Sequence, residues 1–161
     1  MSGAARRASR PALDLLYRLK KRLLRIFRPR TRGVKVMLFN AAGELVLIRN
    51  SYGRTDLFVL PGGGIKRREE PEAAARREIR EELGFEIEGL DFLSEHANCA
   101  GGKNDIVHLF KARVDGAPTP DRFEVEEARF FALDALPEAT SAATRRRIEE
   151  YLGARAADGS W

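Results

Sequence analysis

The sequence predicts an α/β protein in which a mixed β-sheet is sandwiched between helices. Short runs of β-branched and aromatic residues recur along the chain, and two segments with helical spacing of apolar residues stand among them. These segments alternate without the regular strand–helix–strand rhythm of an all-parallel sheet, so a mixed sheet is expected. A chain of 161 residues is long enough for one domain with a hydrophobic core.

The first predicted strands form a hairpin. The segments GVKVMLF (33–39) and ELVLIR (44–49) are joined by the turn-like sequence NAAG, and LFVL (57–60) is a third short strand that runs into Pro61 and three glycines. Later strands are predicted within EGLDFLSEH (88–96), DIVHLFKARV (105–114) and EARFFAL (127–133). A glycine-rich loop at 100–104 separates the first two of these.

Two helices are predicted in this part of the chain. The first extends from Pro71 to Leu83, because proline suits a first helical turn and Gly84 is placed to end the helix. The second lies within SAATRRRIEEYLGARA (141–156) and closes the domain.

Charge divides the chain into a basic leader and an acidic domain. Residues 1–32 contain eleven Lys or Arg and only Asp14 as an acid, a charge of +10, whereas the whole chain carries +5, which leaves −5 for residues 33–161. We expect a leader over residues 1–32, one catalytic domain over residues 33–155 and a short C-terminal tail over residues 156–161.

Several classes of protein are disfavoured by composition. No apolar run approaches the roughly 20 residues of a membrane span, and no secretory signal is recognisable. Cys99 is the single cysteine and cannot form an internal disulfide. With only His96 and His108 beside it, a Cys/His zinc site is not expected. We expect a cytoplasmic protein.

Three glutamates on the first helix are the main candidate functional residues. At about 100° per residue, Glu78, Glu81 and Glu82 fall on one side of the helix, while its apolar residues face another direction. Mg²⁺ prefers oxygen ligands, which carboxylates at this spacing provide. The preceding Gly62-Gly63-Gly64 allows close approach of the backbone to a metal or phosphate. Taken alone, the glutamates would indicate only a solvated, ion-paired helix face.

The combination of glycines and acids is more specific. The pattern G-x5-E-x7-R-E-U-x-E-E-x-G-U, where U is apolar, falls on Gly63, Glu69, Arg77, Glu78, Ile79, Glu81, Glu82, Gly84 and Phe85. This pattern resembles the Nudix box, and residues 33–152 are similar to the layout of Nudix hydrolases. Two positions depart from the family pattern: Phe85 replaces an aliphatic residue, and Arg68 replaces a glycine found in many members.

The resemblance implies a hydrolase that uses Mg²⁺ or Mn²⁺ to cleave a nucleoside diphosphate linked to another group. It implies that Glu78, Glu81 and Glu82 bind metal, with the Gly63 carbonyl as a further ligand. Arg77 would orient a carboxylate, and Glu69 and Gly84 would be structural residues of the box. Glu78 is the first choice for the general base, and the alternatives are acids of a later loop and strand. These are Glu124, Glu126 and Glu127.

The substrate is less well defined. Candidate contacts are Arg49, Tyr52 and Arg54 upstream of the box, and Asn98 and Lys103 in the later loop. The partner expected from the resemblance is a small nucleotide-like molecule, such as a nucleotide, nucleotide sugar or dinucleotide, and a homodimer is compatible with the family.

The leader contains an amphipathic pattern. Between Pro11 and Phe27 its apolar residues recur at spacings of three and four, with Lys20, Lys21, Arg22 and Arg25 mostly off this stripe. Three interpretations stay open: an accessory helix packed on the domain, a helix on an anionic membrane surface, or an RNA-binding element. The second would make the cytoplasmic protein peripheral to a membrane.

Two other functions remain alternatives to small-molecule hydrolysis. One is a nucleotide-sensing module without catalysis, although the complete set of acids disfavours it. The other is an RNA 5′-end pyrophosphohydrolase, for which the basic leader is the support. An isoprenoid diphosphate isomerase is disfavoured, because it would need a further Cys/Glu site and Cys99 is the single cysteine.

Overall fold

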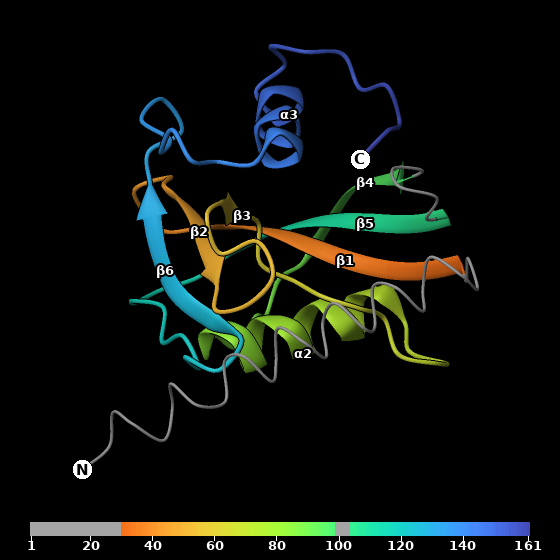
Figure 1. The fold of residues 1–161 in the computed structure, drawn as a ribbon, viewed down its shortest axis with the longest axis horizontal. Coiled ribbons are helices and arrows are strands. Elements are labelled where there is room, and N and C mark those ends of the chain that lie inside the picture. The colour runs from red at the N-terminus through yellow and green to blue at the C-terminus, as the bar shows by residue number, and fades with distance from the viewer. Residues whose placement is uncertain (1–29, 99–103) are drawn as a thin grey trace.

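The computed structural model describes residues 30–98 and 104–161. These residues form a mixed β-sheet with one helix on each side (Figure 1). The strands are β1 (Arg30–Phe39), β2 (Leu45–Asn50), β3 (Phe58–Val59), β4 (Asp91–Asn98), β5 (Asn104–Arg113) and β6 (Val125–Phe131). The helices are α2 (Pro71–Leu83) and α3 (Ala142–Tyr151). The predicted α/β fold class and mixed sheet are confirmed.

The sheet combines parallel and antiparallel pairs. β1 pairs with β5 in parallel, and β4 pairs with β5 in antiparallel orientation. β2 pairs with β6 and with β3, in both cases antiparallel. The strand order is β3-β2-β1-β5-β4, and β6 lies beside β2 off this path.

The predicted hairpin of β1 and β2 is present only at its turn. Asn40 and Glu44 bind each other across this turn, but the strand register contains the single pair Phe39 and Leu45. β1 instead pairs over its whole length with β5, and β2 pairs with β6. The two strands separate because each finds a longer partner elsewhere in the sheet, which sequence adjacency could not indicate.

Each face of the sheet carries its own hydrophobic core. Val34, Val36 and Leu38 of β1 pack with Ala75 and Ile79 of α2. The alternate residues Met37 and Phe39 pack with Ile148 of α3. Side chains along a strand alternate between the two faces, so β1 contributes to both cores and anchors both helices. Figure 1 shows α2 and α3 on opposite sides of the sheet.

The predicted boundaries agree with the structure to different extents. The helix Pro71–Leu83 is confirmed at both ends, whereas α3 covers only the central part of the predicted segment 141–156. β1 begins at Arg30, three residues before the predicted domain start. The predicted tail residues return to the sheet, where Ala97 N donates to Gly159 O and Trp161 N donates to Ala97 O.

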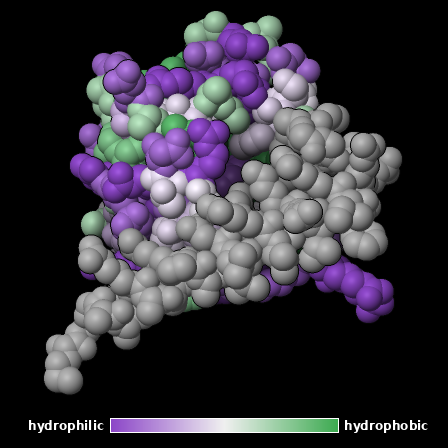
Figure 2. All heavy atoms as spheres, in the orientation of Figure 1, coloured by the Kyte–Doolittle hydropathy of each residue, from purple (hydrophilic) through white to green (hydrophobic). Residues whose placement is uncertain are grey.

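Some predictions fall outside the described residues. The amphipathic leader helix, Cys99 and most of the glycine-rich loop belong to residues 1–29 and 99–103. Within the described ranges, no helix is long and apolar enough to cross a membrane. The described part of the face in Figure 2 is mostly hydrophilic.

Candidate active site

The glycine segment before α2 lies along the edge of β1. Val36 N donates to Pro61 O at 3.0 Å, and Val34 N donates to Gly63 O at 2.9 Å. Gly62 has φ 120°, and a Cβ there would lie 2.4 Å from the Val34 carbonyl oxygen. Glycine at position 62 therefore lets the turn lie directly against β1, because any side chain would collide with that strand.

Gly63 is required for a different reason. A Cβ on Gly63 would lie 2.6 Å from the carboxyl carbon of Glu78. The absent side chain leaves the space into which the Glu78 carboxylate reaches from α2. The glycine turn and the acidic face of the helix are thus in direct contact.

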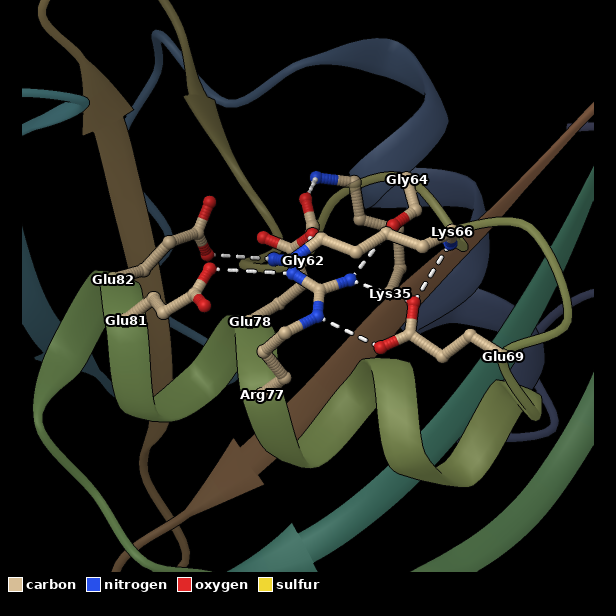
Figure 3. Close-up of polar contacts among 9 residues, drawn as sticks. All are labelled: Lys35, Gly62, Gly64, Lys66, Glu69, Arg77, Glu78, Glu81 and Glu82. Atoms are coloured by element: carbon tan, nitrogen blue, oxygen red, sulfur yellow. Dashed lines mark hydrogen bonds and ion pairs between the residues drawn. The ribbon is translucent and has the colours of Figure 1, made fainter.

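Arg77 binds the acids of the box together (Figure 3). Its Nε and Nη2 donate to the two carboxylate oxygens of Glu69 at 2.7 and 2.9 Å. Its Nη1 donates to Glu78 at 2.8 Å and to Glu81 at 3.2 Å. A further bond from Nη2 reaches the Gly64 carbonyl at 3.0 Å. One guanidinium therefore fixes the glycine turn and three carboxylates relative to each other.

Glu69 connects the loop before α2 to Arg77. Its carboxylate accepts a hydrogen bond from Lys66 N at 2.7 Å, in addition to the paired bonds from Arg77. The Arg77 hydrogen bonds, followed by that of Lys66 N, lower the pKa of Glu69 to about 2. Glu69 is consequently ionised over the whole neutral range.

Glu82 is the most buried acid of the site. Its residue is 7% exposed, and its carboxylate accepts a hydrogen bond from Gly62 N at 2.8 Å. Burial raises the pKa of Glu82 to about 7, while Lys35 and the Gly62 N–H oppose this rise. The nearby charges of Glu78 and Glu124 raise it further. Glu82 thus lies in a place where a cation would be favoured.

Lys35 is a site residue that the motif did not indicate. It lies on β1, and its Nζ donates to the carbonyls of Leu60 and Gly62 at 2.8 and 2.7 Å. Burial lowers the pKa of Lys35, and the charges of Glu82 and Glu78 act in the opposite direction. The available signal was a lone lysine in the otherwise apolar run VKVMLF.

A loop after β5 brings a further acid toward α2. Thr119 N donates to Leu83 O at 2.9 Å, and Asp121 N donates to Glu82 O at 3.3 Å. The next residues lead to Glu124, whose charge acts on Glu82. Gly84, with φ 74°, allows this approach, because a Cβ there would lie 2.2 Å from Thr119 Oγ1.

The predicted upstream substrate contacts do not join the Arg77 network. Arg49 binds Glu127 at 2.5 Å and lies 5.8 Å from the centre of the Phe58 ring. Arg54 is exposed and binds Asp56 at 3.4 Å. Tyr52 is half-buried. Its neighbour Ser51 donates a hydrogen bond from its hydroxyl to the Glu124 carbonyl.

The side chains of the two later substrate candidates lie outside the described residues. Asn98 ends β4, and neither its side chain nor Lys103 is among the described parts of the chain.

Two of the alternative candidates for the general base lie on β6. Glu126 is exposed, and Glu127 forms ion pairs with Arg49 and Arg129.

The two departures from the motif have structural explanations. Phe85 is buried within the α2 core, so the larger side chain is accommodated by packing. Arg68 has φ 64°, the left-handed region that glycine adopts most readily. The backbone has therefore kept the conformation that a glycine would favour.

The donor chemistry of the site fits a hard divalent cation. Burial, and then the charge of the nearby Glu78, raise the pKa of Glu82, and oxygen is the ligand that Mg²⁺ and Mn²⁺ prefer. Within residues 30–98 and 104–161, however, no three acidic, histidine or cysteine side chains are already arranged as a metal site. Glu81 is turned to Arg77 and half exposed.

Comparison with known proteins agrees with this geometry. Residues 29–152 match the NUDIX domain family. The chain is 28% identical over 129 residues to an NAD-capped RNA hydrolase of Pseudomonas aeruginosa. This alignment covers 79% of this chain and 46% of that protein. It is 34% identical over 105 residues to an RNA pyrophosphohydrolase of Rhodospirillum rubrum. This alignment covers 65% of this chain and 58% of that protein.

A solved structure shows the same similarity. The MutT NUDIX hydrolase from Burkholderia pseudomallei superimposes with a TM-score of 0.66 at 29% identity, over 75% of this chain and 97% of that one. The chain spans about half the length of the curated relatives named above. Because the family match covers most of the sequence and includes the glycine turn and the acids of α2, the chain belongs to the NUDIX domain family.

Proposed function

We propose that this protein is a metal-dependent hydrolase that cleaves a diphosphate linkage in a nucleoside diphosphate derivative. The observation that carries the proposal is the buried Glu82 carboxylate, held by Gly62 N beside Glu78 and with its pKa raised to about 7. Burying acids together is unfavourable unless a positive charge balances them, so the close placement of Glu82 and Glu78 supports a cation-binding role.

In this proposal some residues of the site bind metal and others hold those residues in place. Glu78 and Glu82 would bind Mg²⁺ or Mn²⁺, and Glu81 would join them after leaving Arg77. The Gly63 carbonyl accepts a hydrogen bond from Val34 N, and its second lone pair would bind the metal. Arg77, tied to Glu69 and Gly64, would keep Glu78 in place. Bound divalent cations would neutralise the diphosphate and acidify a water molecule.

The general base is assigned to Glu78 in this proposal. Its carboxylate fills the space above Gly63 and is oriented by Arg77, so it has a fixed direction. Glu124 is the second choice, because its charge acts on Glu82 from the opposing loop. The contacts of Glu127 with Arg49 and Arg129 make it a poor candidate.

Substrate hydrolysis with matched variants tests this function. Phosphate release would be measured from nucleoside triphosphates, nucleotide sugars and dinucleotides with Mg²⁺ or Mn²⁺. Glu82→Gln retains an acceptor for Gly62 N but loses the charge, so we expect at least a roughly 100-fold loss of activity. Glu72→Gln is the control, because Glu72 is exposed in the first turn of the same helix.

The outcomes separate the proposal from its alternatives. Metal-dependent cleavage that survives Glu72→Gln and is lost in Glu82→Gln supports the hydrolase. Metal-independent cleavage, or full activity in Glu82→Gln, contradicts it. Metal and nucleotide binding without cleavage of any substrate would instead support the nucleotide-sensing module.

RNA is the second candidate substrate. Two of the similar proteins are named for RNA substrates, and the leader is strongly basic. A truncation that removes residues 1–29 keeps all of β1, which begins at Arg30. If 5′-phosphorylated RNA is the substrate, this truncation should lower RNA cleavage strongly at moderate salt while cleavage of small nucleotides persists.

A further inference from the structure

Lys35 occupies an unusual position for a lysine. It lies within β1, between the buried residues Val34 and Val36, and its side chain extends to the glycine turn. In Figure 3 the Lys35 side chain reaches this turn from the strand, and Glu78 and Glu82 reach it from α2. The lysine and the glutamates therefore approach one short segment from two elements.

The carbonyls of the turn are divided between β1 backbone and the Lys35 side chain. Pro61 O and Gly63 O accept hydrogen bonds from Val36 N and Val34 N. The carbonyls that alternate with these along the chain, those of Leu60 and Gly62, accept hydrogen bonds from Lys35 Nζ. Gly62 also donates its N–H to Glu82, so Lys35 and Glu82 bind the same residue at its carbonyl and amide ends.

A neutral N–H group of suitable length could also donate to these two carbonyls, although a bond from the charged ammonium is stronger. The charge of Lys35 has a separate consequence, because it acts on both Glu82 and Glu78. Charges interact more strongly when they are withdrawn from water, so a half-buried ammonium beside two acids stabilises their ionised forms. The same positive charge must oppose any divalent cation that binds those acids.

We propose that Lys35 is a positioning residue that supplies a fixed counter-charge to Glu78 and Glu82, and thereby weakens the binding of divalent cations to this site. This inference rests on the proposed metal-dependent function. In the metal-free protein the ammonium balances the acids, and in the metal-bound protein it limits how tightly the metal is held. Such a site would release metal together with charged product more readily.

Three substitutions separate the charge from the hydrogen bonds. Lys35→Gln offers the turn a neutral donor on a shorter side chain, Lys35→Met has neither donor nor charge, and Lys35→Arg has both. Mn²⁺ binding would be measured by electron paramagnetic resonance of the free ion, without substrate. Lys111→Met is the control, because Lys111 is a half-exposed lysine on β5 that binds Asp91.

The counter-charge predicts tighter metal binding in both neutral variants. We expect the Mn²⁺ dissociation constant to fall at least about five-fold in Lys35→Gln and Lys35→Met, and to change little in Lys35→Arg and Lys111→Met. The neutral variants should also gain more thermal stability from Mg²⁺ than the wild type does.

Opposite results identify a purely structural lysine. In that case Lys35→Gln and Lys35→Arg bind Mn²⁺ like the wild type, Lys35→Met binds it more weakly, and the inference is overturned. If neither neutral variant folds without metal, restoration of folding by Mg²⁺ supports the counter-charge, and failure to restore it refutes the inference. If the wild type itself binds no Mn²⁺, the proposed function fails instead.

Discussion

Two clusters of buried charge lie on different elements of this protein and differ in how their charges are balanced. In the site cluster, Glu78 and Glu82 face the turn of Gly62 and Gly63, and the pKa of Glu82 is raised to about 7. In the α3 cluster, the fully buried Arg147 binds Glu150 at 2.7 Å and His96. Its guanidinium also lies 5.6 Å from the centre of the Trp161 ring.

The two clusters differ in how far their charges are paired within the protein. Arg147 contacts an acid, an imidazole and an aromatic face, so its charge has partners within the protein, although its Nε is buried without a hydrogen bond. In the site cluster Arg77 binds Glu78 and Glu81, and Lys35 opposes the rise in the pKa of Glu82, yet that pKa is still raised to about 7. The charges of the α3 cluster are therefore paired within the protein, whereas the site cluster keeps a buried acid that a bound cation would stabilise, as the proposed function requires.

The largest expected effect on stability comes from breaking the α3 cluster. Arg147→Met leaves the largely buried Glu150 without its partner, so the free energy of unfolding should fall by about 3 kcal/mol. Chemical denaturation measures this loss, and Mn²⁺ affinity should stay at the wild-type value. Arg155→Met, which removes an exposed arginine paired with Asp158, should change stability by less than about 0.5 kcal/mol. Equal losses in both variants would contradict the structural role of Arg147.

The pH dependence of the metal-free protein should reveal Glu82. The folded-state pKa of about 7 lies above the ordinary value of 4.5, so the folded protein retains a proton that the unfolded chain releases between these values. Stability should therefore fall as pH rises from about 4.5 through 7, by on the order of 2–3 kcal/mol. Denaturation in EDTA measures this slope, and Glu82→Gln should remove it; an unchanged slope in that variant would sink the assignment.

His96 should produce the opposite slope over part of the same range. Burial, and then the charge of Arg147, lower the pKa of His96 to about 4 from 6.5. The unfolded chain binds a proton first, so stability should fall as pH decreases from about 6.5 to 4, by on the order of 2 kcal/mol. His96→Gln keeps an acceptor for Arg147 and should remove this loss. Comparing each variant with the wild type separates the two opposing contributions.

The smallest expected effect concerns the loop before Glu69. Arg68→Gly relieves a left-handed backbone at φ 64°, and the flexibility of glycine in the unfolded chain offsets part of the gain. We expect a net gain of about 0.5 kcal/mol in the free energy of unfolding, measured by thermal denaturation. The neighbouring Arg67→Gly has no such strain to relieve and should lose stability by a similar amount. A loss in Arg68→Gly would show that its side chain contributes more than its backbone conformation costs.

Sequence pattern was sufficient for the features that depend on local spacing. Pro71 and Gly84 fixed both ends of α2, and the spacing of the box placed Arg77 against Glu69, Glu78 and Glu81. These contacts arise within one helix and the loop before it, where residue spacing determines which side chains meet. The assigned roles of these residues stay predictions until the variants are measured.

Tertiary structure alone decided the contacts between elements distant in the chain. The pairing of β1 with β5, rather than with β2, brings the strand that carries Lys35 into the centre of the sheet. The loop at 119–124 brings Glu124 toward Glu82, and the C-terminal residues place Trp161 on Arg147. Such contacts depend on which strands pair and which faces pack, and these choices are made by burial over the whole domain rather than by local residue order.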